Sequence, residues 1–152
     1  MNRSKPPLKM QPIVLSEPVP EVLEAWALEA YPHETCGLLL GRSDSTAIQA
    51  LWGTRAENLD RRRPHDRFTL DPVGFLTADR QARDLGLEIV GIWHTHPDHP
   101  AEPSRTDLEA AWEGYSYLIL STHESGVADL RSWRLCEEKF HEQDILREDL
   151  PL

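Results

Sequence analysis

Two histidines and one aspartate in a short stretch of the sequence could bind a divalent metal ion. His94 and His96 are separated by a single residue, and Asp107 follows shortly after them. Side chains two positions apart on a strand point to the same face, so both imidazoles could be directed at one ion. Two histidines and one carboxylate leave one tetrahedral position open for water, which is the arrangement of a catalytic rather than a structural zinc site.

Hydrolysis at such a site needs a base that takes the proton of the water and passes it to the leaving group. Glu34 is the candidate, because it lies between a predicted helix and a predicted strand, where a carboxyl group can line a cleft. Ser104 places a hydroxyl near the ligands in the sequence. It could donate a hydrogen bond to the oxyanion of a tetrahedral intermediate, a contact worth about 3 kcal/mol.

Each of these residues also has a purely structural explanation. The segment Ser-Arg-Thr-Asp at 104–107 fits the capping-box pattern of a helix start. A His-x-His pair can consist of two exposed or hydrogen-bonded histidines, and most glutamates are simply solvated. It is the combination that favours a catalytic metal site.

The elements that must position these residues follow from hydrophobic periodicity and turn signals. Apolar residues at three- and four-residue spacing predict a helix over 21–31, and Asp71 followed by Pro72 predicts a capped helix that ends at Gly86. The helix over 72–85 should bury Phe75, Ala78, Ala82 and Leu85. A third helix is predicted over 104–113, with Leu108, Ala111 and Trp112 facing inward.

Short apolar runs bounded by turn residues predict six strands: 13–15, 35–41, 47–52, 88–94, 115–121 and 127–135. The first of them should lie at a sheet edge. The polar segment 54–67 is expected to be a surface loop, and the charged end, 137–152, to be helical or frayed. Alternating strands and helices indicate an α/β or α+β fold with helices on a central sheet. We find no internal repeat, and expect a single domain over 1–152 with its core at about 14–135.

Composition excludes several classes of function. The 152 residues include 26 acidic side chains and 16 Lys plus Arg, for a net charge of −10. This balance argues against binding nucleic acid or anionic membranes broadly. The only thiols, Cys36 and Cys136, are far apart, which suits a reducing compartment. Without an apolar leader or a run of membrane-spanning length, the sequence is expected to be cytoplasmic.

The spacing of the candidate site resembles the JAMM motif of the MPN (Mov34/PAD-1) metalloproteases. The motif is carried by His94-Thr95-His96, seven further residues, Ser104, two more, and Asp107, with Glu34 upstream. Three longer segments resemble the stand-alone prokaryotic members, and the match covers about 14–135. They are Pro32-His33-Glu34-Thr35-Cys36-Gly37, then Asn58 before Phe68-Thr69-Leu70-Asp71-Pro72, and Gly91-Ile92-Trp93-His94-Thr95-His96-Pro97.

This resemblance implies a zinc-dependent peptidase or isopeptidase with one Zn²⁺ per chain. His94, His96 and Asp107 would be the zinc ligands, Glu34 the general base and acid, and Ser104 a support for the intermediate. The implied fold is a curved mixed β-sheet flanked by helices, related to the cytidine deaminase fold. The implied partner is a ubiquitin-like protein or a small β-grasp sulfur carrier with a C-terminal Gly-Gly tail. The oligomeric state stays open, with a homodimer as one option.

Three rival functions share part of this pattern. A non-catalytic MPN scaffold would have lost ligands that are present here. A non-haem iron enzyme also uses two histidines and a carboxylate, but it has no need of Glu34 and Ser104. A zinc deaminase would need a Pro-Cys-x-x-Cys segment, which the sequence lacks.

A few other residues could serve the site, although each has a simpler explanation. His99 is expected to be a solvated loop histidine and Cys36 a small buried hydrophobe. Arg61, Arg62 and Arg63 fit either a grip on an acidic partner or a solvated basic turn. The five tryptophans are spread over the predicted elements and are expected in the core: Trp26, Trp52, Trp93, Trp112 and Trp133.

Overall fold

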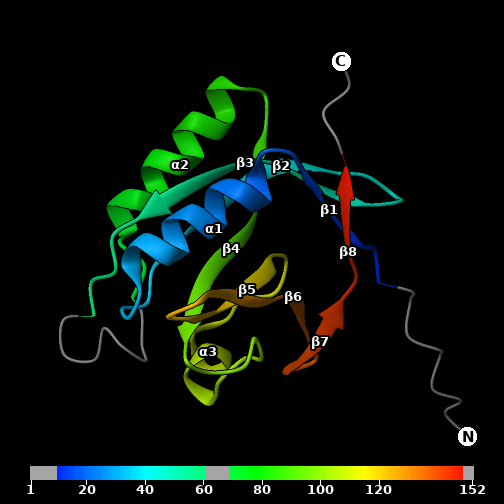
Figure 1. Cartoon of the computed structure of the whole chain (residues 1–152). Helices are drawn as coiled ribbons and strands as arrows, with labels where there is room; N and C mark the ends of the chain where they lie inside the picture. Colours follow the sequence, from blue (N-terminus) through cyan, green and yellow to red (C-terminus); the bar gives the residue numbers. More distant parts are fainter. Residues whose placement is uncertain (1–9, 61–68, 149–152) are drawn as a thin grey trace, which may run out of the picture.

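A single curled sheet of eight strands, with three helices packed around it, makes up the part of the chain that this computed structural model describes, residues 10–60 and 69–148 (Figure 1). The helices are α1 (Val19–Ala30), α2 (Pro72–Asp84) and α3 (Arg105–Ala110). The strands are β1 (Ile13–Ser16), β2 (Cys36–Ser43), β3 (Ile48–Ala56), β4 (Glu88–Pro97), β5 (Ser116–His123), β6 (Gly126–Cys136), β7 (Lys139–Gln143) and β8 (Ile145–Glu148).

The sheet is mixed, with the order β7-β6-β5-β4-β2-β3-β1-β8. β4 pairs in parallel with β5, and β1 pairs in parallel with both β3 and β8, while the remaining neighbours are antiparallel. The predicted α/β (α+β) class, a curved mixed sheet flanked by helices, is therefore confirmed. Strand β4, which carries both candidate histidines, lies in the interior of the sheet between β2 and β5.

Helices α1 and α2 cover opposite faces of the sheet, and strand β2 shows the division residue by residue. Leu39 belongs to the core cluster that contains Leu23 of α1. Leu38 and Leu40 belong to the second cluster, which contains Ala78 of α2. Because successive side chains of a strand point to opposite faces, this alternation fixes which face each helix covers. Both faces of β2 are thus buried, in keeping with its continuous apolar run.

The start and end of α2 are as predicted. The carboxylate of Asp71 accepts a hydrogen bond from the backbone N–H of Val73 at 2.9 Å, and Pro72 occupies the first helical position. Gly86 follows the helix with φ +69°, a conformation that glycine adopts without strain. The predicted burial of Leu85 is wrong, because this residue caps the helix and its side chain is 51% exposed.

The C-terminal segment forms strands β7 and β8, so the predicted helical or frayed end is wrong. Glu137 and Glu138 turn the chain back at positive φ, 51° and 66°, which starts the hairpin between β6 and β7. The buried Gln143 accepts a hydrogen bond from Ser132 Oγ at 2.8 Å and donates one to the carbonyl of Gln11 at 2.9 Å. Since β8 then adds beside β1, the predicted edge position of 13–15 is also wrong.

Helix α3 is shorter than predicted and ends at Ala110 rather than at 113. Ala111 is extended, and the backbone N–H of Trp112 donates to the hydroxyl of Tyr117 at 2.8 Å. Leu108 and Trp112, predicted to face inward, are 39% and 64% exposed. The helical pattern in the sequence thus continues past Ala110, whereas the backbone becomes extended at Ala111.

The tryptophans divide between core and surface. Trp93 is fully buried, Trp26 stacks on it at a ring-centroid distance of 5.9 Å, and Trp133 is half-buried. The prediction that all five belong to the core is wrong for Trp52, which is 50% exposed, and for Trp112.

The predictions of a surface loop and of a single domain extend into residues that the structure does not describe. The predicted loop over 54–67 starts three residues too early, because β3 runs through Ala56. Its segment 61–67, which contains Arg61, Arg62 and Arg63, lies outside the described residues. The single-domain prediction over 1–152 stays a prediction.

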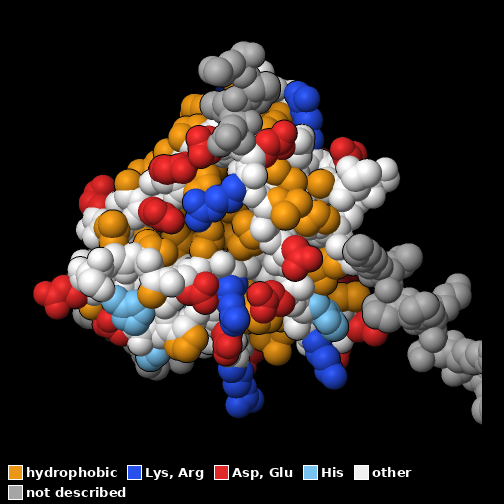
Figure 2. Space-filling view, turned by 45° about the vertical axis from the view of Figure 1, so that its right-hand side comes forward, with side chains coloured by type: hydrophobic (Ala, Val, Ile, Leu, Met, Phe, Trp, Pro, Cys, Tyr) orange, Lys and Arg blue, Asp and Glu red, His pale blue; other side chains and the backbone are white. Residues whose placement is uncertain are grey.

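Among the described helices, none has the length and apolarity needed to cross a membrane. On the face shown in Figure 2, Lys and Arg side chains are dispersed among acidic ones.

Candidate active site

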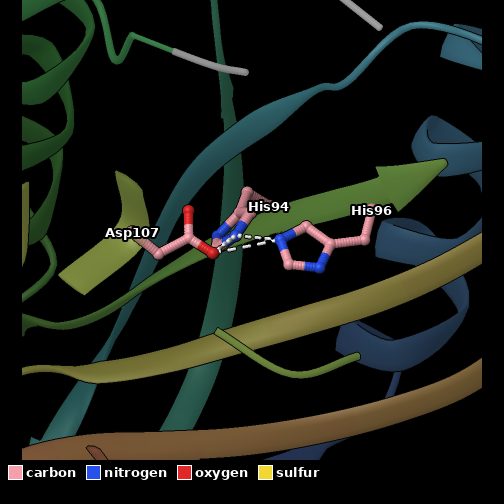
Figure 3. Close-up of side chains that lie close together, drawn as sticks. All are labelled: His94, His96 and Asp107. Atoms are coloured by element: carbon pink, nitrogen blue, oxygen red, sulfur yellow. Dashed lines mark hydrogen bonds and ion pairs between the residues drawn. The ribbon is translucent and has the colours of Figure 1, made fainter. Parts of the chain in front are cut away.

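The side chains of His94, His96 and Asp107 converge on one point (Figure 3). The two Nε2 atoms of the histidines are 3.1 Å apart. Oδ2 of Asp107 lies 3.3 Å from Nε2 of His94 and 3.1 Å from Nε2 of His96. The three residues predicted as metal ligands are therefore brought together, two from β4 and one from α3.

Strand β4 positions the histidines from within rather than beyond its end, because it continues through Pro97. His94 is paired in register with Cys36, the first residue of β2. One step further, the backbone of Thr35 exchanges two hydrogen bonds with Thr95, each 3.0 Å long. This pairing holds the chain that carries Glu34 beside the histidine-bearing end of β4.

A capping box at the start of α3 positions Asp107. The hydroxyl of Ser104 accepts the backbone N–H of Asp107 at 3.0 Å, and Oδ2 of Asp107 accepts the backbone N–H of Ser104 at 2.9 Å. The structural explanation of this segment is therefore correct, and it coexists with the ligand geometry. The same carboxylate oxygen that closes the box faces both imidazoles, and the hydroxyl proton of Ser104 is left available for a second partner.

The donor set fits a divalent cation. Nδ1 of His96 lies 2.9 Å from the carbonyl oxygen of Pro100, which can only accept, so Nδ1 carries the proton of this hydrogen bond. In the neutral ring, Nε2 then presents a lone pair to the carboxylate oxygen of Asp107 and to the other imidazole. Two electron-rich atoms, Nε2 of His96 and Oδ2 of Asp107, then face each other at 3.1 Å, which favours a cation between them. Two imidazoles and a carboxylate form a donor set that zinc accepts.

Burial and the contacts among the three candidate ligands shift their pKa values in different directions. Burial lowers the pKa of His94, which keeps this imidazole neutral. Burial alone would raise the pKa of Asp107, but the adjacent imidazoles hold it well below its usual range. For His96, burial acts to lower the pKa, while the hydrogen bonds with Asp107 and Pro100 raise it overall. The carboxylate is thus ionised, and one face of the site is strongly shielded from water.

Glu34 lies on the same side of the metal ligands as Ser104. It is only 6% exposed, and a pocket of about 300 Å³ is lined by Glu34, His96 and Ser104 together. The backbone carbonyl of Glu34 accepts a hydrogen bond from Nδ2 of Asn58 at 3.3 Å. The fold therefore places the predicted base and the predicted oxyanion donor beside one of the two histidines.

Asn58 is a functional candidate that reasoning about single residues missed. Besides donating to Glu34, its Oδ1 accepts the backbone N–H groups of Asp60 and Thr69, each at 2.9 Å. The Asn58 side chain thus links the backbone of Glu34 to the backbone of Asp60 and of Thr69, which precedes α2. The signal in the sequence was its place in the family pattern, ahead of the segment that begins α2.

Cys36 and His99, the other candidates among the described residues, have the burial that the sequence predicts. Cys36 is fully buried, and burial, with Glu34 nearby, raises its pKa to about 12, so it is a small hydrophobe rather than a thiolate ligand. His99 is exposed and lies at the wall of the pocket that contains Glu34.

Comparison with known proteins finds named relatives that match much of this chain. A desampylase from Haloferax volcanii is 37% identical over 94 residues, which cover 59% of this chain and 63% of that protein. The CysO-cysteine peptidase from Mycobacterium tuberculosis is 29% identical over 135 residues, covering 88% of this chain and 89% of that protein.

Solved structures agree on the fold. A protein from Desulfitobacterium hafniense, 32% identical, superposes with a TM-score of 0.80 over 90% of this chain and 93% of its own. A JAB1/MPN domain protein from Archaeoglobus fulgidus, 17% identical, has the same fold at a TM-score of 0.52, over 92% of this chain and 98% of its own.

The family model that describes prokaryotic homologs of the JAB domain matches residues 16–136, from the end of β1 to the end of β6. This span contains all five predicted site residues and confirms the resemblance drawn from the sequence. The chain belongs to the family of prokaryotic JAB-domain proteins.

Proposed function

We propose that this protein is a zinc-dependent peptidase or isopeptidase that cuts after the C-terminal Gly-Gly of a ubiquitin-like or β-grasp sulfur-carrier protein. The observation that carries the proposal is the convergence of two histidine nitrogens and a carboxylate oxygen within 3.3 Å of one another, beside a pocket that contains Glu34. The names of its relatives, a desampylase and a CysO-cysteine peptidase, support this substrate class. A relative from Thermus thermophilus is named a probable TtuB-protein conjugate cleaving protease.

His94, His96 and Asp107 would hold the ion. A zinc ion held there polarises a carbonyl oxygen and lowers the pKa of water. His96 is oriented for this task by its Nδ1 contact with the carbonyl of Pro100, and Asp107 by the capping box of α3. Outer contacts of this kind fix the ring and the carboxylate in place before any ion arrives.

Glu34 is assigned the proton transfers. Its carboxylate takes a proton from the attacking water as the carbon–oxygen bond forms, and then gives that proton to the departing nitrogen as the carbon–nitrogen bond breaks. The hydroxyl of Ser104 donates a hydrogen bond to the oxygen that becomes negatively charged, because the capping box uses this hydroxyl only as an acceptor. The products are a carrier ending in a glycine carboxylate and a free amine.

The complete ligand set and the presence of Glu34 in the pocket favour an enzyme over a non-catalytic scaffold. A non-haem iron enzyme would use the same three ligands, but a buried base beside them serves hydrolysis. The two free thiols, one of them exposed, support the further proposal of a cytoplasmic setting.

The proposal is tested with a β-grasp sulfur carrier that has been extended beyond its Gly-Gly by a short peptide or a single cysteine. Incubation with the zinc-loaded protein should give a carrier whose mass ends at the second glycine, together with the released amine. Full-length carrier after prolonged incubation, or a cut at another bond, would contradict the proposed function.

A further inference from the structure

Two pockets of different chemical character meet at the candidate metal ligands. The larger, with a volume of about 510 Å³, lies between α2, β4 and α3 and includes His94 and Asp107 in its wall. The smaller, of about 300 Å³, includes His96, Glu34 and Glu102. The three ligands thus form the boundary between the pockets, so a substrate bound across the metal would extend into both.

The position of Glu34 decides which part of the substrate enters which pocket. Glu34 lines the smaller pocket and is absent from the wall of the larger one. In the proposed function, on which this inference rests, Glu34 gives a proton to the departing nitrogen, so this nitrogen must lie on the side of the smaller pocket. The chain on the acyl side of the cut bond must then leave in the opposite direction, along the larger pocket.

The larger pocket is built to receive an apolar side chain. Phe75, Ile92 and Trp112 contribute to its wall, and apart from His94 and Asp107 the described residues that line it are uncharged. Its rim is formed in part by Leu76 and Trp112, which are 67% and 64% exposed. Large apolar side chains exposed together at the edge of a pocket are typical of a binding surface, because their burial on binding is favourable.

The smaller pocket has a larger share of charged and polar side chains in its wall than the larger one. Glu34 and Glu102 bring carboxylates to it, His99 brings an imidazole, and Glu102 is held by Arg131 at 3.2 Å. Such a wall suits a small polar leaving group that carries an amine.

We infer that the pocket between α2 and α3 is the specificity pocket for the acyl side of the substrate, and that it selects a tail with a bulky apolar residue shortly before the Gly-Gly. An extended chain advances about 3.3 Å per residue, so the residue before Gly-Gly lies about 7 Å from the cut bond. That distance is within the reach of a pocket that begins at His94 and Asp107 and extends to Leu76.

The test uses two pairs of short peptides and the zinc-loaded protein. The acyl-side pair is acetyl-Leu-Gly-Gly-Lys-amide and acetyl-Asp-Gly-Gly-Lys-amide. The leaving-side pair keeps Ala before Gly-Gly and places Leu or Asp after the Lys. The wild-type chain should cleave the Leu peptide of the first pair with a kcat/KM at least about tenfold above that of the Asp peptide, and should distinguish the second pair less than about threefold.

Helix α2 offers a matched pair of variants. Leu76 lines the pocket, whereas Val73, equally exposed at 66%, does not. Leu76→Asp should lower kcat/KM for the acyl-side Leu peptide about tenfold, through KM, and Leu76→Lys should raise cleavage of the Asp peptide. Val73→Asp should leave both values within about twofold of wild type. Because both side chains are exposed, neither substitution should disturb folding.

Calorimetric titration of the product peptides acetyl-Leu-Gly-Gly and acetyl-Asp-Gly-Gly separates this inference from the proposed function. A Leu preference in binding that Leu76→Asp removes, without cleavage of any peptide, supports the pocket and overturns the proposed function. Cleavage that ignores the acyl-side residue, a preference only on the leaving side, or equal effects of Leu76→Asp and Val73→Asp overturn the inference and leave the proposed function intact. Absence of both binding and cleavage contradicts both.

Discussion

Nδ2 of Asn58 lies 3.3 Å from the backbone carbonyl oxygen of Glu34, to which it donates a hydrogen bond. The same side chain accepts the backbone N–H groups of Asp60 and Thr69. Asn58 is therefore a positioning residue, because it fixes the backbone from which the candidate base projects.

The substitution Asn58→Asp tests this role, because it keeps the Oδ1 acceptor for Asp60 and Thr69 and removes the donor to Glu34. We expect kcat on a Gly-Gly conjugate to fall about five- to tenfold, the worth of one hydrogen bond, while KM and zinc content stay unchanged. Steady-state kinetics and metal analysis of the same preparation measure this. An unchanged kcat would show that Glu34 is positioned without Asn58.

The assignment of ligands and base predicts different metal contents for two variants. His94→Ala removes one of three donor atoms and should lose the bound zinc on dialysis. Glu34→Gln should retain about one zinc per chain, because Glu34 serves the water rather than the ion. Metal analysis by mass spectrometry of the dialysed proteins checks both. Loss of zinc in Glu34→Gln to the same extent as in His94→Ala would make Glu34 a ligand and remove it from the role of base.

Gly37 is predicted to be required for stability, because a Cβ at this position would overlap the carbonyl oxygen of Thr54 and Nε1 of Trp93. These two atoms share a hydrogen bond of 2.7 Å inside the sheet, so neither can move freely. Gly37→Ala should lower the free energy of unfolding by about 3 kcal/mol, as measured by urea titration.

Gly53→Ala is the matched control for that substitution. A Cβ at Gly53 would meet Cδ2 of the buried Leu23 at 3.2 Å, a contact that a shift of a few tenths of an ångström relieves, and should cost less than about 1 kcal/mol. If both glycine variants were equally stable, the close approach of β2 and β3 at Gly37 would be disproved.

The pKa of Cys36, raised to about 12 by burial, predicts a loss of stability in alkaline solution. The unfolded thiol ionises near 9.0, whereas the folded thiol stays neutral, so the unfolded chain binds fewer protons between these values. The free energy of unfolding should therefore decrease as pH rises above about 9, by about 1 kcal/mol per pH unit.

Urea titrations of the wild-type chain and of Cys36→Ala, each at about pH 8 and about pH 10, isolate this contribution. The variant should be less stable overall but should lose less stability between the two conditions. An equal loss in both proteins would mean that Cys36 ionises as readily folded as unfolded.

The candidate metal ligands could be predicted from the sequence because their geometry is local. His94 and His96 share a face of one strand by the period of the strand, and Asp107 is placed by a capping box that the sequence itself encodes. Glu34 could be suggested from its place between a predicted helix and a predicted strand, but its approach to the histidines depends on the pairing of β2 with β4, which is not local.

The errors lie where tertiary packing overrides the local pattern. The charged C-terminal segment becomes β7 and β8 because the buried Gln143 is satisfied by Ser132 and by the carbonyl of Gln11, which lies far away in the sequence. The helical pattern over 104–113 predicts an inward Trp112, but α3 ends before this residue and leaves its side chain in the wall of a pocket. A surface that binds a partner and a core look alike in sequence, because both are apolar.

The rate of amine release from a Gly-Gly conjugate, with zinc content determined in the same samples, tests the central claim most directly. The zinc-loaded wild-type chain should cleave after the second glycine, and Glu34→Gln should be at least about a hundredfold slower at equal zinc content. A Glu34→Gln variant as fast as wild type, or activity that follows bound iron rather than zinc, would contradict the account.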